Sequence, residues 1–210
     1  PCYDHDIQGW PYDLELAKEK LDAAGWIDSD GDGIRDKEID GKRIPFEFGL
    51  VIYGSSNEFA TISNIYREAL LQIGVKMTPR PLEWSTLLKR LDERAFEAYT
   101  GAWVMDWEVD LFQLWHSSEA DRPKSSNRIG FRSKEADTII EELRVTFDKE
   151  RRVELCHEFH ALVHELQPYT FVYQRYRPVL YWDHMNEPEF HQVYPFRDPR
   201  LLSFHEFAAP

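Results

Sequence analysis

The spacing of apolar residues along the chain alternates between a helical period and short runs typical of strands. Apolar residues recur every three or four positions in the predicted helices, which cover 14–24, 57–73, 84–91, 109–115, 135–146 and 149–166. Runs rich in β-branched and aromatic residues predict strands over 44–53, 75–80, 96–104 and 169–176. Strands and helices alternate in the first half, as in βαβ units, so we predict an α/β fold with a mixed sheet flanked by helices.

The chain shows no linker, internal repeat or low-complexity tract, and we predict a single α/β lobe over residues 1–210. From Trp182 onward the periodicity is weak and prolines and aromatics are frequent, which predicts an irregular tail over 182–210. The longest apolar runs have the length of strands, too short for a transmembrane helix. The sequence opens at Pro1 without an initiator Met, as a fragment of a longer protein would.

The first predicted helix leads into a run of alternating aspartates. Asp13 stands where an N-cap belongs and Gly25 where a helix ends, and the loop that follows contains Asp28, Asp30, Asp32 and Asp36. This spacing matches the first nine positions of an EF-hand calcium loop, although Ile39 stands where a bidentate Glu is needed and the flanks are a helix and a strand. The residues leave two interpretations open, a degenerate calcium site or a turn whose aspartates accept backbone amides.

A second acidic position follows the strand predicted over 96–104. Asp106 lies between Trp103 and Trp107, where the carboxyl end of the strand would present it. Ligands of α/β sheets bind at the carboxyl ends of strands, and a carboxylate between two indoles suits an ammonium group through charge pairing and cation–π attraction. The alternative is that Asp106 caps the next helix and both indoles belong to the core.

Composition narrows the classes of partner. The net charge of −13 argues against nucleic acid and anionic membranes. Aromatic residues make up 14% of the chain, including seven Trp, so some rings are candidates to face a ligand. We find no nucleophile elbow, phosphate-binding Gly loop or Cys/His pair, so the chain is not expected to be an enzyme and needs no cofactor beyond the candidate calcium.

Two further residue types carry weaker signals. Cys156 lies on an apolar helical face and is expected to be a buried thiol, while Cys2 lies at the terminus. His157, His160 and His164 share one helix, which allows a zinc site and a metallohydrolase, but the spacing is not that of zinc proteases and no further ligand is marked. We therefore expect the histidines to lie at the edge of the core.

Several blocks, taken in order, resemble one large protein family. The resemblance runs from about Tyr12 to Tyr176 and rests on the order and spacing of Tyr12-Asp13, Ala24-Gly25-Trp26 with Asp30-Gly31-Asp32-Gly33, Gln72-Ile73-Gly74-Val75, Trp103 with Asp106 and Asp110, Ser126-Asn127 with Gly130-Phe131, Glu135-Ala136-Asp137, Arg151-Arg152 and Gln167-Pro168-Tyr169. The series is similar to the C-terminal lobe of the family-5 extracellular solute-binding proteins, the peptide- and nickel-binding receptors of ABC importers.

The resemblance implies a periplasmic-binding-protein type II fold, in which a missing N-terminal lobe closes on the solute. It implies a periplasmic or extracellular receptor that binds a peptide or another small solute and delivers it to an ABC permease. Asp106 occupies the place of the Asp that holds the α-amino group in peptide-binding members, with Trp103, Trp107 and Asn127 as further ligand contacts. The strand before Trp103 lacks an Arg of the kind that holds a peptide carboxylate in some members.

Overall fold

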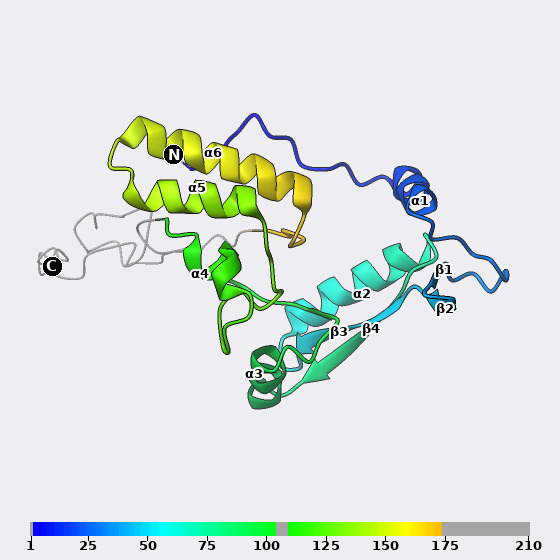
Figure 1. Ribbon diagram of the computed structural model, residues 1–210. Helices are drawn as coiled ribbons and strands as arrows, with labels where there is room; N and C mark the ends of the chain where they lie inside the picture. Colours follow the sequence, from blue (N-terminus) through cyan, green and yellow to red (C-terminus); the bar gives the residue numbers. More distant parts are fainter. Residues whose placement is uncertain (1, 104–108, 174–210) are drawn as a thin grey trace, which may run out of the picture.

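The computed structural model describes residues 2–103 and 109–173 of the chain. Its elements form two units, a three-stranded sheet with its covering helices and a separate layer of helices (Figure 1). None of the described helices combines the length and the apolar character needed to cross a membrane. In chain order the elements are α1 (Leu14–Ala23), β1 (Asp36–Ile39), β2 (Lys42–Pro45), β3 (Glu47–Tyr53), α2 (Asn57–Leu71), β4 (Lys76–Leu82), α3 (Trp84–Asp92), β5 (Ala98–Tyr99), α4 (Phe112–Trp115), η1 (Ser117–Glu119), α5 (Lys134–Val145) and α6 (Lys149–Leu166).

The sheet has the strand order β4-β3-β5, and all neighbours run parallel. Val51 of β3 packs with Leu87 and Leu91 of α3, while Ile52 alternates to the opposite face, where α2 covers β3 and β4. Both faces are therefore covered, as is usual for parallel strands. Parallel pairing also brings the carboxyl ends of the three strands to one side of the sheet.

The helical layer contains the larger core. Leu143 of α5 and Leu155 of α6 are fully buried. Other buried apolar residues lie three or four positions away from each of them, on the same helix face. Arg151 of α6 joins the two helices by donating to Glu142 of α5 at 2.8 Å. The carboxylates of Glu142, Glu154 and Glu158 raise the pKa of Arg151. The buried residues of the core in this helical layer are Trp115, Ala136, Ile139, Ile140, Leu143, Leu155, Cys156, Phe159 and Val163.

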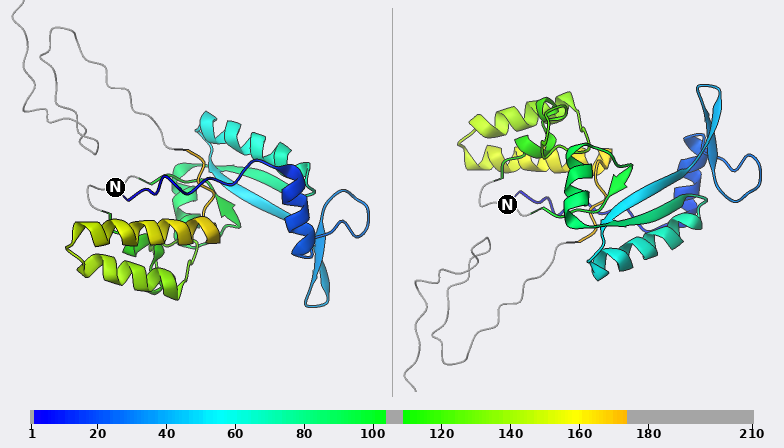
Figure 2. Two further views of the ribbon diagram at one scale, coloured as in Figure 1. Left: turned by 90° about the horizontal axis from the view of Figure 1, so that it is seen from above. Right: turned by 90° about the horizontal axis from the view of Figure 1, so that it is seen from below.

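A β-hairpin projects beyond the end of the sheet unit (Figure 2). The sequence predicts one strand over 44–53, but two strands meet there, β2 and β3, separated by Phe46. The hairpin turn is Asp40-Gly41, with positive φ angles of 52° and 73°. A two-residue turn with both φ angles positive matches the twist of antiparallel strands, which accounts for the Asp-Gly pair.

Two further expectations are wrong in the described residues. Cys156 is not a free thiol, because it forms a disulfide with Cys2, whose Cα lies 4.9 Å away. The N-terminal segment runs from this bond along α6 and across to α1 (Figures 1 and 2). Residues 169–173 form no strand, since they leave α6 and cross to α2, where Tyr173 donates to Glu58. The tail expected over 182–210 lies outside the described residues.

Candidate functional site

The carboxyl ends of the parallel strands hold several of the aromatic residues. Trp103 follows β5 and exposes 41% of its surface, and Trp84 follows β4 and exposes 55%. Tyr53, the last residue of β3, meets Trp84 edge to face with ring centroids 5.5 Å apart. Crevices at this end of a parallel sheet are where ligands of α/β proteins bind. Asp106 and Trp107, the other residues predicted here, lie outside the described residues.

Trp103 has a charged neighbour that the sequence did not point to. The guanidinium carbon of Arg128 lies 5.9 Å from the centroid of the Trp103 ring, within cation–π range. Arg128 belongs to the loop between η1 and α5, far along the chain from Trp103. The only signal in the sequence is its place beside Asn127 in the Ser126-Asn127 block.

Two tyrosines complete this surface, which we call the strand-end cluster: Tyr99, Trp103, Arg128 and Tyr169. Burial raises the pKa of the Tyr99 hydroxyl, and the nearby Arg128 guanidinium opposes that rise. Burial also raises the pKa of Tyr169, with Tyr99 adding to the effect. The pKa shifts show that the tyrosine hydroxyls lie in a poorly hydrated place, where a charge interacts more strongly than in water.

Asn127 positions the loop and does not face the strand-end cluster as a free ligand contact. Its side chain is fully buried, and its Nδ2 donates to the carbonyls of Phe131 and His116 at 2.9 and 3.3 Å. Its Oδ1 accepts the Phe131 amide at 2.8 Å, and its own carbonyl accepts from Arg94 at 3.0 Å. These bonds fix the backbone beside Arg128, so the predicted ligand contact is replaced by a residue that holds the loop.

The acidic loop is the second candidate site. Asp28 accepts the amides of Gly31 and Gly33 at 2.8 and 3.0 Å, which are turn bonds of the Asx kind. Asp32 accepts the Ile34 amide at 2.8 Å. The loop therefore uses its own backbone donors to satisfy its carboxylates.

Three of the four predicted metal ligands converge. Carboxylate oxygens of Asp28, Asp30 and Asp36 lie within 4.8 Å of one another, whereas Asp32 does not join the group. Arg43 of β2 already supplies positive charge there. It forms an ion pair with Asp30, and its Nε lies 4.0 Å from Oδ2 of Asp36. The Ser29 hydroxyl lowers the pKa of Asp36, which outweighs the raising effect of burial, and the Ser29 amide and Arg43 lower it further. A calcium ion would compete with these internal partners.

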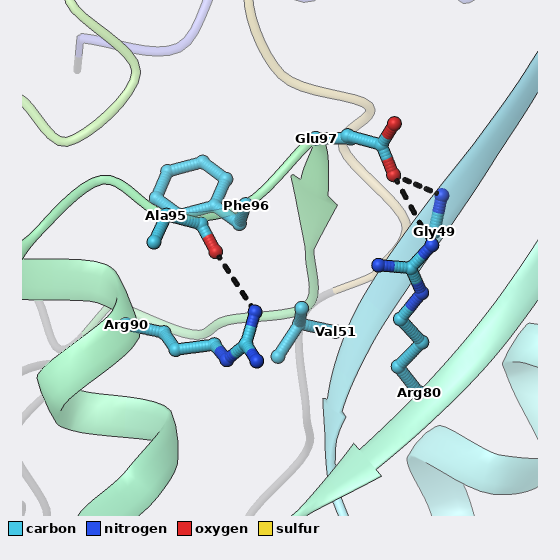
Figure 3. A pocket seen from close by; sticks show the side chains of 7 residues that line it. All are labelled: Gly49, Val51, Arg80, Arg90, Ala95, Phe96 and Glu97. Carbon is cyan, nitrogen blue, oxygen red and sulfur yellow. Dashed lines mark hydrogen bonds and ion pairs between the residues drawn. The ribbon is translucent and has the colours of Figure 1, made fainter.

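A hollow of about 270 Å³ lies at the amino end of β5 (Figure 3). Its charged groups are satisfied from within. Glu97 accepts a hydrogen bond from the Gly49 amide at 2.6 Å, and its carboxylate lies 3.7 Å from the Arg80 guanidinium. Arg90 donates to the Ala95 carbonyl at 3.4 Å. The hollow is therefore a weaker candidate for a ligand site than the strand-end cluster.

The histidines of α6 do not gather into a metal site within the described residues, whose candidate metal group is the acidic one. His160 accepts the Asp4 amide at 3.2 Å, and His164 stacks on Trp10 with ring centroids 5.3 Å apart. These two histidines instead hold the N-terminal segment against α6, as expected for residues at the edge of a core.

Comparison with known proteins assigns the fold and the family. The chain is 29% identical to the oligopeptide-binding protein AppA of Bacillus subtilis over 201 residues, which cover 95% of this chain and 35% of AppA. It is 28% identical to heme-binding protein A of Haemophilus influenzae over 170 residues, which cover 80% of this chain and 28% of that protein. The chain thus spans about a third of the length of these curated relatives.

The structure of AppA in complex with a nonapeptide superimposes with a TM-score of 0.72 at 28% identity, covering 80% of this chain and 33% of AppA. This similarity confirms the predicted α/β lobe of the periplasmic-binding-protein type II kind. Residues 1–124 match the middle region of the bacterial extracellular solute-binding proteins, family 5, whose members are transport receptors and not enzymes. By this match over more than half of its length, the chain belongs to the family-5 bacterial extracellular solute-binding proteins.

Proposed function

We propose that this chain is the ligand-capture lobe of an extracellular or periplasmic receptor that feeds an ABC importer, with peptides as the solutes. The observation that carries the proposal is the strand-end cluster, where a half-exposed indole and a guanidinium meet at the carboxyl end of β5. A relative that covers 95% of this chain is named as an oligopeptide-binding protein. Another relative is named for heme, so the peptide class is part of the proposal.

The mechanism follows from the geometry of an open lobe. The strand-end cluster presents one wall of a site, and a second lobe of the same protein would supply the other wall. Solute contacts to both lobes would favour the closed state, because a ligand shifts a conformational equilibrium by its differential affinity for the two states. In this proposal Asp106 pairs with the amino group of the solute, and Trp103 and Trp107 flank it.

The Asp106→Asn variant of the complete protein, with whatever sequence flanks these residues, tests the amine role. Removing the negative charge should weaken binding of peptides with a free amino end at least tenfold, and should leave binding of N-acetylated peptides unchanged. Asp110→Asn is the matched control, because Asp110 accepts the Phe112 amide at 3.1 Å and pairs with Arg144 at 3.6 Å. Equal affinities of Asp106→Asn and wild type for both kinds of peptide would reject the amine role.

A second proposal concerns the acidic loop, which is either a calcium site or a closed turn. The convergence of Asp28, Asp30 and Asp36 favours a cation, and the internal amide bonds together with Arg43 favour a closed turn. We favour the closed turn, because the loop already holds a positive charge. A calcium-stabilised interaction module without a transport role would require that this charge be displaced.

A further inference from the structure

The first residues of the chain form a strap along α6, which we call the N-terminal strap, residues 2–13 (Figures 1 and 2). One end of the strap is fixed by the disulfide between Cys2 and Cys156 of α6. Towards the other end, the Trp10 ring stacks on the imidazole of His164 of α6, with ring centroids 5.3 Å apart. The strap is therefore attached to the helical layer at two places, and one of them is covalent.

Helix α1 carries the strap over to the sheet unit. The Lys20 ammonium of α1 lies 5.2 Å from the centroid of the Trp10 ring, within the range of a cation–π contact. Near the end of α1, Asp22 forms an ion pair with Arg35. Arg35 also donates to the carbonyl of Ile73, just after α2, at 2.8 Å. A series of contacts therefore runs from α6 through the strap and α1 to the helix that covers the sheet.

Apart from the disulfide, little holds the strap in place. None of residues 2–13 is buried, and α1 has no buried residue either. The Asp4 amide donates to Nδ1 of His160 at 3.2 Å, and the Tyr3 ring lies 4.9 Å from the His160 ring. Burial of apolar surface is the main source of stability, and segments with few buried contacts open most easily. The strap thus depends on its covalent bond to stay on α6.

The two units that the strap joins also meet at the strand-end cluster. Tyr99 and Trp103 come from the sheet unit, whereas Arg128 and Tyr169 come from the loop before α5 and the segment after α6. The Arg128 guanidinium lies 5.9 Å from the centroid of the Trp103 ring, so the two units are close together there. This closeness depends on how the helical layer is placed against the sheet unit, which is what the strap helps to fix.

We propose that the Cys2–Cys156 disulfide is a redox-sensitive lock on the strap, and that its reduction by a dithiol frees the strap and loosens the helical layer from the sheet unit. Cys2 is half-buried and Cys156 is buried, so the dithiol reaches Cys2 first. A thiolate of the dithiol attacks Sγ of Cys2, the S–S bond breaks, and Cys156 leaves as a thiolate that takes up a proton.

The second thiol of the reagent then attacks the mixed disulfide and releases Cys2 as a thiol. The protein gains two electrons and two protons, and the dithiol is oxidised to a disulfide. The inference holds whichever solute the lobe binds, because it concerns the placement of the two units and not the ligand.

Fluorine NMR on the complete protein, labelled with fluorotryptophan, tests the lock. Replacing Trp10, Trp26 and Trp103 by Phe, one at a time, assigns their resonances. Reduction by millimolar dithiothreitol, verified by alkylation of both thiols, should move the Trp10 resonance towards that of the free amino acid and should also shift the Trp103 resonance. Trp26 packs on Phe46 within the sheet unit, with ring centroids 4.4 Å apart, so its resonance should stay in place.

Cys2→Ser should show, without reductant, the same shifts that reduction causes in wild type, and dithiothreitol should change them no further. His5→Gln is the matched control on the strap, because His5 is exposed and its ring contacts Tyr3. It should keep the oxidised resonances until dithiothreitol is added. The response of wild type is measured without any substitution at the disulfide, so the inference can fail even if Cys2→Ser does not fold.

A Trp10 resonance that stays in place after both thiols are free would overturn the lock. A disulfide that millimolar dithiothreitol leaves intact in the folded protein would overturn its redox sensitivity. A Trp10 shift with an unchanged Trp103 resonance would overturn the link between the strap and the strand-end cluster. Shifts caused by dithiothreitol in Cys2→Ser would assign the response to another bond and would also overturn the lock.

Discussion

The acidic loop and the strand-end cluster both gather charged or polar side chains, but the loop pairs its carboxylates with backbone amides and an arginine, whereas the strand-end cluster sets its arginine over an indole. Asp28 and Asp32 accept backbone amides of the same turn, and Arg43 neutralises Asp30. At the strand end, Arg128 and Tyr169 have buried polar atoms without a hydrogen-bond partner among the described residues. The loop is therefore satisfied within itself, whereas the strand-end cluster keeps a half-exposed indole beside a cation.

This difference separates local structure from the solute recognition that we propose. The acidic motif is conspicuous in the sequence, and the closed turn that we propose accounts for its spacing. The strand-end cluster leaves little trace in the sequence, because its members come from β5, the loop after η1 and the segment after α6. The comparison therefore predicts different effects in the two regions. Substitutions in the acidic loop should change the response to calcium, whereas substitutions in the strand-end cluster should change peptide binding.

The largest effect is expected at Asn127, on which the strand-end loop depends. Asn127→Ala would leave the Phe131 amide, the Phe131 carbonyl and the His116 carbonyl without partners in a buried place. We expect a loss of about 3 kcal/mol in the free energy of unfolding, which corresponds to a fall of about 6–12 °C in melting temperature.

Thermal unfolding followed by circular dichroism measures this change. Asn64→Ala is the control, because Asn64 is exposed on α2, and its melting temperature should stay close to that of wild type. An Asn127→Ala protein that melts like wild type would mean that the loop presenting Arg128 is held by other contacts, Arg94 first among them.

A smaller effect is expected when calcium is added. Wild type should show a shift of less than about 1 °C in melting temperature at millimolar calcium, because a ligand stabilises only the state that binds it. Arg43→Gln should lower the melting temperature without calcium and respond to calcium more than wild type does, since the carboxylates of Asp30 and Asp36 lose their cation.

Arg67→Gln, whose partner Glu68 lies on α2, should not acquire a response to calcium. A rise of several degrees in wild type on addition of calcium, reversed by a chelator, would show that the loop is a metal site and that the comparison between the two regions is wrong.

The smallest effect concerns the pKa of Asp36. Ser29 hydrogen bonds lower this pKa below its usual value of 3.8, so the stabilising contribution of Asp36 is present above pH 3.8 and is lost as the pH falls through the lower value in the folded state. Ser29→Ala should raise the folded-state pKa of Asp36 towards 3.8, so the loss becomes smaller and is complete at a higher pH. A carboxyl NMR titration measures it, with Ser55→Ala as the control on an exposed serine.

The sequence predicts elements whose signals are local and misses those that depend on distant partners. The bounds of α6, the Asp13 cap and the Gly25 stop follow from apolar period and side-chain chemistry, and the structure confirms them. The Asp40-Gly41 turn was not predicted, because this Asp-Gly pair comes soon after the Asp-Gly pairs of the acidic loop. The Cys2–Cys156 bond could not be deduced, since two cysteines 154 residues apart give no sign of their proximity.

The candidate site divides in the same way. Trp103 was predicted from its place after a strand, and the structure puts it at the carboxyl end of β5. Arg128 was missed because its closeness to Trp103, which lies far away along the chain, exists only in three dimensions. Asn127 was taken for a ligand contact because an amide side chain beside a loop looks available, whereas its bonds to Phe131 and His116 consume it.

Peptide calorimetry on wild type, Trp103→Ala and Asp30→Asn forms of the complete protein tests the central contrast most directly. With the alanine peptide that wild type binds best, Trp103→Ala should weaken binding about tenfold or more, because a large aromatic wall is lost. Asp30→Asn should bind like wild type, with or without calcium. Wild-type affinity in Trp103→Ala, together with lost or calcium-dependent binding in Asp30→Asn, would contradict the account and move the recognition site to the acidic loop.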